Sequence, residues 1–135
     1  MTLKIGDKAS RTKIVTEADI LAFAQASGDT NPVHLDDDYA ATTRFGRCIA
    51  HGMLTASVIS AILGNDLPGP GTVYMSQTLA FKAPVFIGDV VTATVEVIAY
   101  REQRRIATFH TTCTNQDGTL VLDGEAVVLA PKAGV

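Results

Sequence analysis

The chain has 135 residues, of which 47% are hydrophobic and 19% charged, and its formal net charge is −3. This length fits one domain with a hydrophobic core, and the composition excludes disorder and fibrous repeats. The acidic balance excludes the broad basic field of a nucleic-acid-binding protein. No apolar run has the form of a signal peptide or a membrane span, and two cysteines do not make a disulfide framework. We therefore expect a cytoplasmic protein with free thiols and with neither a nucleic-acid nor a membrane partner.

The first segments predict a strand and then a helix. Residues 11–15 have the composition of a short strand. Thr16 followed by Asp19 resembles a capping box, in which two side chains satisfy free amides at the start of a helix. Gly28 is suited to end that helix, since glycine readily adopts the conformation found after a last helical turn.

The residues that follow predict a rigid loop. Pro32 lacks an amide hydrogen and pushes Asn31 toward an extended conformation, so we expect no helix over residues 29–34. Asp and Asn side chains in this segment can also bind nearby backbone groups, which stiffens the loop. Residues 37–43 predict one or two helical turns.

The segment His51–Leu63 predicts the central helix. It contains no proline, has Gly52 near its start, and has Gly64 where a helix commonly ends. Its apolar residues surround most of the helix instead of forming one stripe, which favours a helix enclosed by the rest of the domain. It is too short to span a bilayer.

The second half of the chain predicts long strands. Asp117-Gly118 between two such segments indicates an antiparallel hairpin. The expected strands are Thr72–Phe81, Asp89–Arg101, Arg105–Thr114 and Thr119–Leu129. Sequential strands joined by hairpins favour an α+β fold. We predict a single domain over residues 1–135 with a hot-dog fold, an antiparallel sheet of about five strands wrapped around the central helix.

Asp29 and His34 are the first candidate catalytic residues. They lie five residues apart on the rigid loop, which can direct a carboxylate and an imidazole to the same place. Such a pair can hold a water molecule and move its protons, with the carboxylate as base. The alternative is that Asp29 caps the turn and His34 faces solvent.

Gly52 is the second candidate. The first amides of a helix have no intrahelical acceptor and lie at the positive end of its dipole. Because Gly52 has no side chain, an oxygen can approach its N–H closely, and that amide can stabilise an enolate-like thioester. The alternative is that Gly52 only lets the chain turn into a packed helix.

These residues lie in a motif that resembles a known family. The segments SGDTNPVHLDDDYA and FGRCIAHGMLTASVIS closely resemble the (R)-specific enoyl-CoA hydratases of the MaoC-like group. The later segments VYMSQTLAFKAPVFIGDVV and GEAVV are also similar, so the resemblance covers nearly the whole chain. The family motif has the form G-D-x-N-P-x-H-x-D, which this chain carries as Gly28, Asp29, Asn31, Pro32, His34 and Asp36.

The resemblance implies a specific activity. Asp29 and His34 would hold the water that adds to a trans-2-enoyl-CoA, the Gly52 amide would lie in the oxyanion hole, and Ser60 would assist. The product would be an (R)-3-hydroxyacyl-CoA. CoA would be part of the substrate, and neither a metal nor a redox cofactor would be needed. Family members form homodimers by joining their sheets, which would also hide an exposed sheet edge.

Three alternatives stay open at this stage. The same chemistry can act on acyl carrier protein thioesters or on specialised acyl-CoA substrates. A hot-dog protein can also bind acyl-CoA without catalysis, or hydrolyse the thioester, because fold does not fix function. Acyl chain length and pathway, whether polyhydroxyalkanoate precursor supply or fatty-acid breakdown, do not follow from the sequence.

Other polar residues have simpler interpretations. We expect His51 to help start the central helix and His110 to be structural. The acidic run beginning at Asp36 suits a helix start, and no Cys/His spacing indicates zinc. Four basic residues are candidates for contacts with CoA phosphates, and the sequence does not choose among Arg44, Lys82, Arg104 and Arg105.

Overall fold

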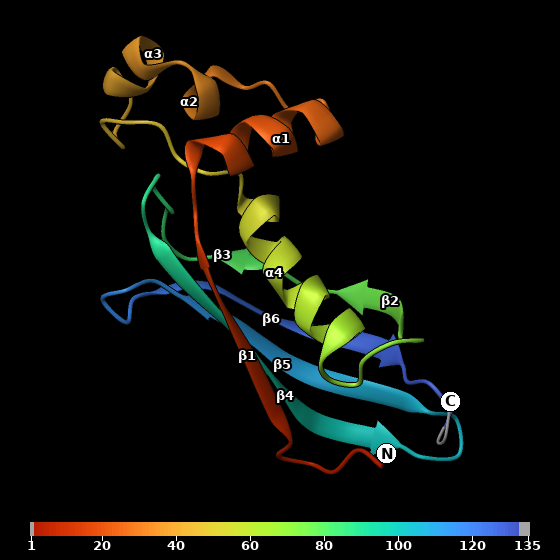
Figure 1. The fold of residues 1–135 in the computed structure, drawn as a ribbon. Helices are drawn as coiled ribbons and strands as arrows, with labels where there is room; N and C mark the ends of the chain where they lie inside the picture. The colour runs from red at the N-terminus through yellow and green to blue at the C-terminus, as the bar shows by residue number, and fades with distance from the viewer. Residues whose placement is uncertain (1, 133–135) are drawn as a thin grey trace.

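The computed structural model describes residues 2–132, which form one antiparallel sheet and four helices. In chain order the elements are β1 (Lys8–Ile14), α1 (Glu17–Ser27), α2 (Pro32–Leu35), α3 (Asp37–Ala41), α4 (Gly52–Asn65), β2 (Val73–Gln77), β3 (Ala80–Phe81), β4 (Val90–Arg101), β5 (Ile106–Thr114) and β6 (Leu120–Leu129). The α4 helix crosses one face of the sheet, and α1, α2 and α3 gather beyond its N-terminal end (Figure 1). No helix among the described residues is long and apolar enough to cross a membrane.

The strand order is β1-β4-β5-β6-β2, with every pairing antiparallel. The predicted hairpin between β5 and β6 is confirmed. Its turn closes on Asn115, whose Oδ1 accepts hydrogen bonds from the backbone N–H groups of Asp117 and Thr119. Gly118 has φ of 77°, a conformation that glycine adopts without strain.

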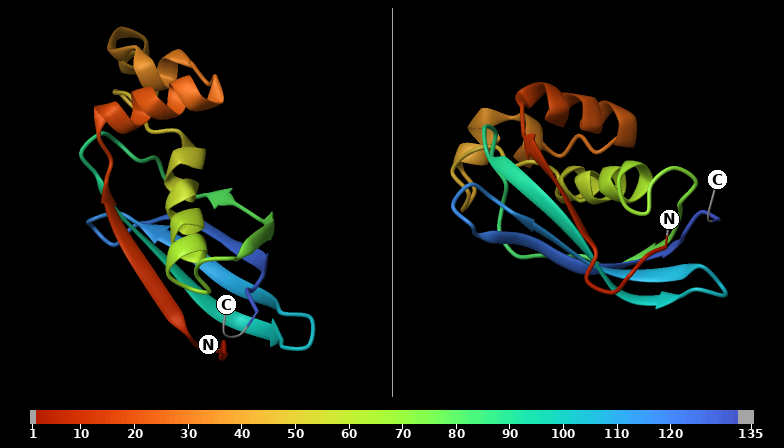
Figure 2. Two further views of the ribbon diagram at one scale, coloured as in Figure 1. Left: turned by 45° about the vertical axis from the view of Figure 1, so that its right-hand side comes forward. Right: turned by 60° about the horizontal axis from the view of Figure 1, so that its bottom comes forward.

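The core forms between the sheet and α4. Alternate residues of β4 point to one face, so Val91, Val95 and their inward neighbours are fully buried while the residues between them are partly exposed. On the helix side, Ile59 and Ile62 are also fully buried and belong to the same apolar cluster. Figure 2 shows the sheet curving around this side of α4. The predicted hot-dog arrangement is therefore present.

The α4 helix departs from expectation at its end and on one side. It continues through Gly64 to Asn65, because a glycine inside a helix is tolerated when tertiary packing supports the neighbouring turns. It is also only partly enclosed. The sheet covers a single side of α4, so Met53 is 54% exposed and Ser57 and Ser60 face outward.

The segment predicted as one strand over Thr72–Phe81 is two strands. β2 and β3 both pair with β6, and the chain crosses Gly124 between them. An added Cβ at Gly124 would lie 1.9 Å from the carbonyl oxygen of Thr78, so only glycine permits this crossing. The break makes the described sheet six-stranded instead of about five-stranded.

The first residues of α1 and α3 agree with the helix-start signals in the sequence. Thr16 Oγ1 accepts from the Asp19 N–H at 3.1 Å, and Asp19 Oδ2 accepts from the Thr16 N–H at 3.0 Å, so the capping box is confirmed. An ion pair with Lys13 and the Thr16 amide lower the pKa of Asp19. Gly28 ends α1 with φ of 80°, and Asp36 caps α3 by accepting from the Tyr39 N–H.

Candidate active site

The loop that carries Asp29 and His34 is partly helical, which the sequence did not predict. Asn31 caps a short helix, α2, because its Oδ1 accepts from the Val33 N–H at 3.1 Å. Pro32 occupies the first position of this helix, where its missing amide hydrogen costs nothing and its fixed φ is suitable. The proline therefore starts a helical turn that carries His34.

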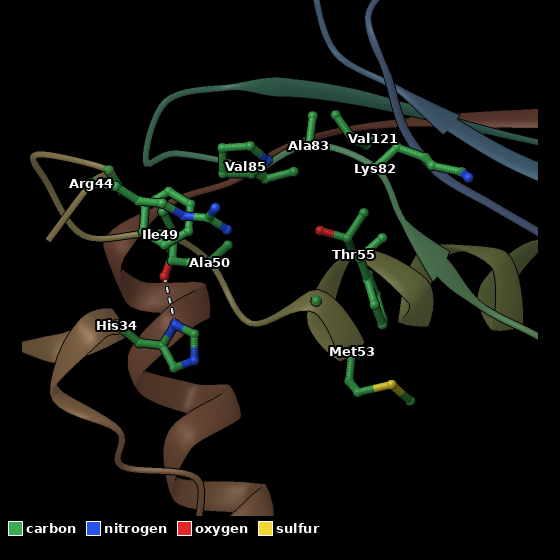
Figure 3. Close-up of a pocket in the computed structure, with 14 residues that line it drawn as sticks. His34, Arg44, Ile49, Ala50, Met53, Thr55, Lys82, Ala83, Val85 and Val121 are labelled. Carbon is green, nitrogen blue, oxygen red and sulfur yellow. Dashed lines mark hydrogen bonds between the residues drawn. The ribbon is translucent and has the colours of Figure 1, made fainter.

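The His34 imidazole is held in one orientation. Its Nδ1 lies 2.7 Å from the carbonyl oxygen of Ile49, which can only accept, so Nδ1 carries the hydrogen (Figure 3). In the neutral ring Nε2 then carries the lone pair, and this atom lies 4.0 Å from Asp29 Oδ2. This separation is too long for a direct hydrogen bond and matches a gap that one water molecule can bridge.

His51 contacts both candidates, although the sequence assigned it only to the helix start. Its side chain makes no capping hydrogen bond and is 2% exposed. Its Nε2 lies 3.0 Å from the Asp29 carbonyl oxygen, so Nε2 donates. The ring also stacks on His34, with centroids 3.9 Å apart, and packs against Phe23. His51 thus joins the Asp29 backbone to the His34 ring.

Asp29, His34 and His51 offer a carboxylate oxygen and two imidazole nitrogens within 4.8 Å of one another. This donor set is common in metal sites. A shared ion would have to lie in both imidazole planes at about 2.1 Å from each nitrogen. The two rings are instead stacked with an angle of 30° between their planes, and the His51 Nε2–H is already donated to Asp29. The arrangement therefore fits a metal poorly.

The start of α4 lies beside His34. The N–H groups of Leu54 and Thr55 both donate to the His51 carbonyl, which leaves the amides of Gly52 and Met53 without an acceptor among residues 2–132. An added Cβ at Gly52 would lie only 2.6 Å from the Phe81 ring, so a larger residue here would have to displace that ring.

His34 and the first turn of α4 line the same cavity. It is bounded by the loop before α4, the first turn of α4 and the segment after β3 (Figure 3). The residues that line it are His34, Arg44, Phe45, Ile49, Ala50, Gly52, Met53, Thr55, Phe81, Lys82, Ala83, Pro84, Val85 and Val121. The structure therefore brings His34 and Gly52 to one cavity. Asp29 is not among the residues that line this cavity, and its Oδ2 lies 4.0 Å from His34 Nε2.

Ser60 lies elsewhere. It lines a neighbouring cavity between α4 and β2, together with Ser57, Tyr74 and Met75. Eight residues separate it from Gly52, a distance of about 12 Å along the helix axis. Met53 borders both cavities, so the two spaces are adjacent at that side chain. Ser60 is thus not part of the cavity that contains His34 and Gly52.

Among the four basic candidates, Arg44 and Lys82 line the His34 cavity. The Arg44 guanidinium lies over the Phe45 ring at 4.8 Å from its centroid. Arg104 and Arg105 are in the turn between β4 and β5, and Arg105 donates to the Ala130 carbonyl. The sequence did not distinguish Arg44 and Lys82 from Arg104 and Arg105, because which basic residues line the cavity depends on how distant segments pack.

Comparisons with known proteins agree with this architecture. Residues 4–118 match the MaoC like domain. Over 132 residues the chain is 53% identical to an (R)-specific enoyl-CoA hydratase from Rhodospirillum rubrum, covering 98% of this chain and 91% of that protein.

Two solved structures are also similar. An (R)-hydratase from Aeromonas caviae involved in PHA biosynthesis superposes with a TM-score of 0.93 at 52% identity, covering 96% of this chain and 98% of that one. An unliganded R-hydratase from Pseudomonas aeruginosa gives 0.91 at 47% identity, with 96% and 83% covered. The chain belongs to the MaoC-like domain family.

Proposed function

We propose that this protein reversibly adds water to a trans-2-enoyl-CoA to give an (R)-3-hydroxyacyl-CoA. The observation that carries the proposal is the 4.0 Å gap between Asp29 Oδ2 and His34 Nε2, beside a cavity that His34 and Gly52 both line. The similar proteins from R. rubrum and A. caviae are named as (R)-specific enoyl-CoA hydratases, which supports this reaction and its stereochemistry.

The proposed step follows from the donors and acceptors of the pair. A water molecule between the two groups donates one hydrogen bond to Asp29 Oδ2 and one to the lone pair of His34 Nε2. Asp29 accepts a proton as the water oxygen forms a bond to C3 of the substrate. The electron pair of the C2–C3 double bond moves toward the thioester oxygen, and the Gly52 N–H stabilises the resulting negative charge. The pair then returns one proton to C2, so the net change is the addition of one water.

The atom balance of this reaction requires no oxidant or reductant, and the amide dipole supplies the electrophilic assistance. We therefore propose catalysis without a metal or redox cofactor. Arg44 and Lys82 line the same cavity and are suited to the phosphates of CoA, since both side chains are cationic. The buried free thiols of Cys48 and Cys113 fit a protein of the reducing cytoplasm.

We also propose that the protein is a homodimer joined through β2. This strand lies at the end of the sheet order, and Val73, Tyr74 and Met75 on it are exposed. An uncovered sheet edge with exposed apolar side chains favours pairing with a second strand. Sedimentation analysis, which measures the mass of the particle in solution, tests this arrangement. The parent should sediment as a dimer, and Met75→Lys should weaken the dimer.

The decisive test is hydration of crotonyl-CoA, followed by the loss of enoyl absorbance and by chiral analysis of the product. We expect Asp29→Ala and His34→Ala each to lower kcat/KM by about 10³-fold or more, since general acid–base groups contribute about 10²- to 10⁴-fold. Asp38→Ala and His110→Ala are matched controls, because Asp38 is exposed on α3 and His110 pairs with Asp123 on the sheet.

Full activity in either the Asp29 or the His34 variant, or an (S)-product from the parent, would contradict the proposal. Release of free CoA without hydration would indicate a thioesterase instead. Faster turnover of an acyl carrier protein thioester than of the CoA thioester would reassign the substrate while keeping the reaction.

A further inference from the structure

Thr55 carries a buried polar atom that the mechanism above does not use. The residue lies in the first turn of α4 and is 4% exposed. Its Oγ1 has no hydrogen-bond partner within residues 2–132. Buried hydroxyls are nearly always hydrogen-bonded, so an unpaired one in a cavity wall indicates a partner that comes from outside the protein.

The usual internal partner does not account for this hydroxyl. Threonine in a helix commonly bonds back to the carbonyl four residues earlier, which here belongs to His51. That carbonyl already accepts from the N–H groups of Leu54 and Thr55, and the Thr55 Oγ1 has no contact with it within hydrogen-bond distance. In Figure 3 the Thr55 oxygen points away from the helix and into the cavity.

The facing walls offer no acceptor either. Among the side chains that line the same cavity, those of Ala50, Ala83, Val85 and Val121 are apolar, and those of Arg44 and Lys82 can only donate hydrogen bonds. The hydroxyl therefore lies in a mostly apolar space where a hydrogen bond with a ligand is strengthened by exclusion of water.

We propose that Thr55 Oγ1–H donates to the thioester oxygen of the bound substrate, next to the Gly52 amide. This inference rests on the proposed hydratase function and adds a residue to it. Residues three apart lie on the same helix face, and helical side chains lean toward the N-terminus, so the Thr55 side chain covers the turn that begins at Gly52. A carbonyl oxygen can accept two hydrogen bonds, and both strengthen as it gains negative charge.

The test compares Thr55→Val, which keeps the shape and removes the hydroxyl, with Thr55→Ser, which keeps the hydroxyl. We expect Thr55→Val to lower kcat for crotonyl-CoA by about 10- to 100-fold with KM changed less than about threefold, as for loss of a donor used in the transition state. Thr55→Ser should stay within about fivefold of the parent.

The Tm for thermal unfolding without substrate is a second readout. A purely structural role for the hydroxyl predicts that Thr55→Val lowers the Tm. Removing an unpaired buried hydroxyl should raise the Tm of Thr55→Val by a few degrees. Thr94→Val is the matched control, because that hydroxyl is paired with Ser10 on the outer side of the sheet, and neither its Tm nor its activity should rise.

Parental kcat in Thr55→Val, a loss confined to KM, or a lowered Tm would each overturn the inference. An inactive parent would instead refute the proposed function. The two failures are distinguishable because parental turnover is measured first in the same assay.

Discussion

Substituting Gly52 by alanine tests the amide end of α4 with the smallest possible change. The new methyl would lie 2.6 Å from Cε1 of Phe81, whereas ordinary contacts begin near 3.4 Å, so the ring must withdraw by about 0.8 Å. Phe81 is 53% exposed and can turn outward. The clash costs about 1 kcal/mol, and alanine in a helix offsets about as much, so we expect the free energy of unfolding to change by less than about 1 kcal/mol.

The effect on activity should be far larger than the effect on stability. The methyl group would lie beside the amide nitrogen, so we expect it to hinder the approach of the thioester oxygen in the proposed reaction, and displacement of the substrate by about 1 Å can cost about 100-fold in rate. Crotonyl-CoA kinetics and urea unfolding of the same preparation measure the two effects. Gly64→Ala is the matched control on the same helix, since nothing lies within 4 Å of the added Cβ there. It should be slightly more stable and fully active.

The result that refutes this reasoning is a Gly52→Ala enzyme with kcat/KM within about threefold of the parent. A double variant with Phe81→Ala separates the two consequences of the methyl group. It should relieve the steric contact without restoring the rate, because the methyl group still covers the amide. Recovery of full activity in the double variant would assign the loss to the displaced ring.

Two further sets of substitutions test other parts of the site, and an alkylation experiment tests the environment of Cys48. Arg44→Glu should raise KM for crotonyl-CoA by about tenfold but hardly affect a thioester without phosphates, measured against Arg104→Glu at the remote turn between β4 and β5. His51→Phe keeps the stacked ring and removes the N–H donated to Asp29, so kcat should fall about tenfold, whereas His51→Gln keeps a donor and should lose less. Equal activity in the two His51 variants would contradict this positioning role. Burial, followed by the hydrogen bond to Asp37, raises the pKa of Cys48 to about 11, so its thiol should be alkylated at pH 8 at least about 100-fold more slowly in the native protein than in urea.

Most local signals in the sequence predicted local structure correctly, although the Asn31 cap and the Pro32 start of α2 were interpreted as a loop. The capping box at Thr16 and the Asp117-Gly118 hairpin depend on residues a few positions apart, and both are confirmed. Elements that depend on distant partners were predicted less accurately. The break between β2 and β3 follows from the way the chain passes over Gly124, which is remote in sequence. The two residues that α4 gains beyond Leu63 depend on packing, which overrode the glycine signal.

Predictions for the candidate site show the same difference between local and distant contacts. Asp29 and His34 were predicted to lie together because a short, stiff segment joins them, and their side chains do approach. His51 was missed, since its hydrogen bond to Asp29 spans 22 residues and no spacing rule reports it. Thr55 was missed because a hydroxyl without a partner is recognised only when its surroundings are known.

Ile49 and Ala50, which precede the N-cap residue of α4, form hydrogen bonds with segments on both sides. The Ile49 N–H donates to the Val33 carbonyl and the Ala50 N–H to the Val85 carbonyl, while the Ile49 carbonyl accepts from His34. The carbonyl that orients the His34 imidazole therefore lies only three residues before Gly52, where α4 begins. For protein engineering, this makes the positions next to Val33 and Ile49 poor places for insertions, and the turn at residues 102–104, which is exposed, a suitable one for a fluorophore or an immobilisation handle.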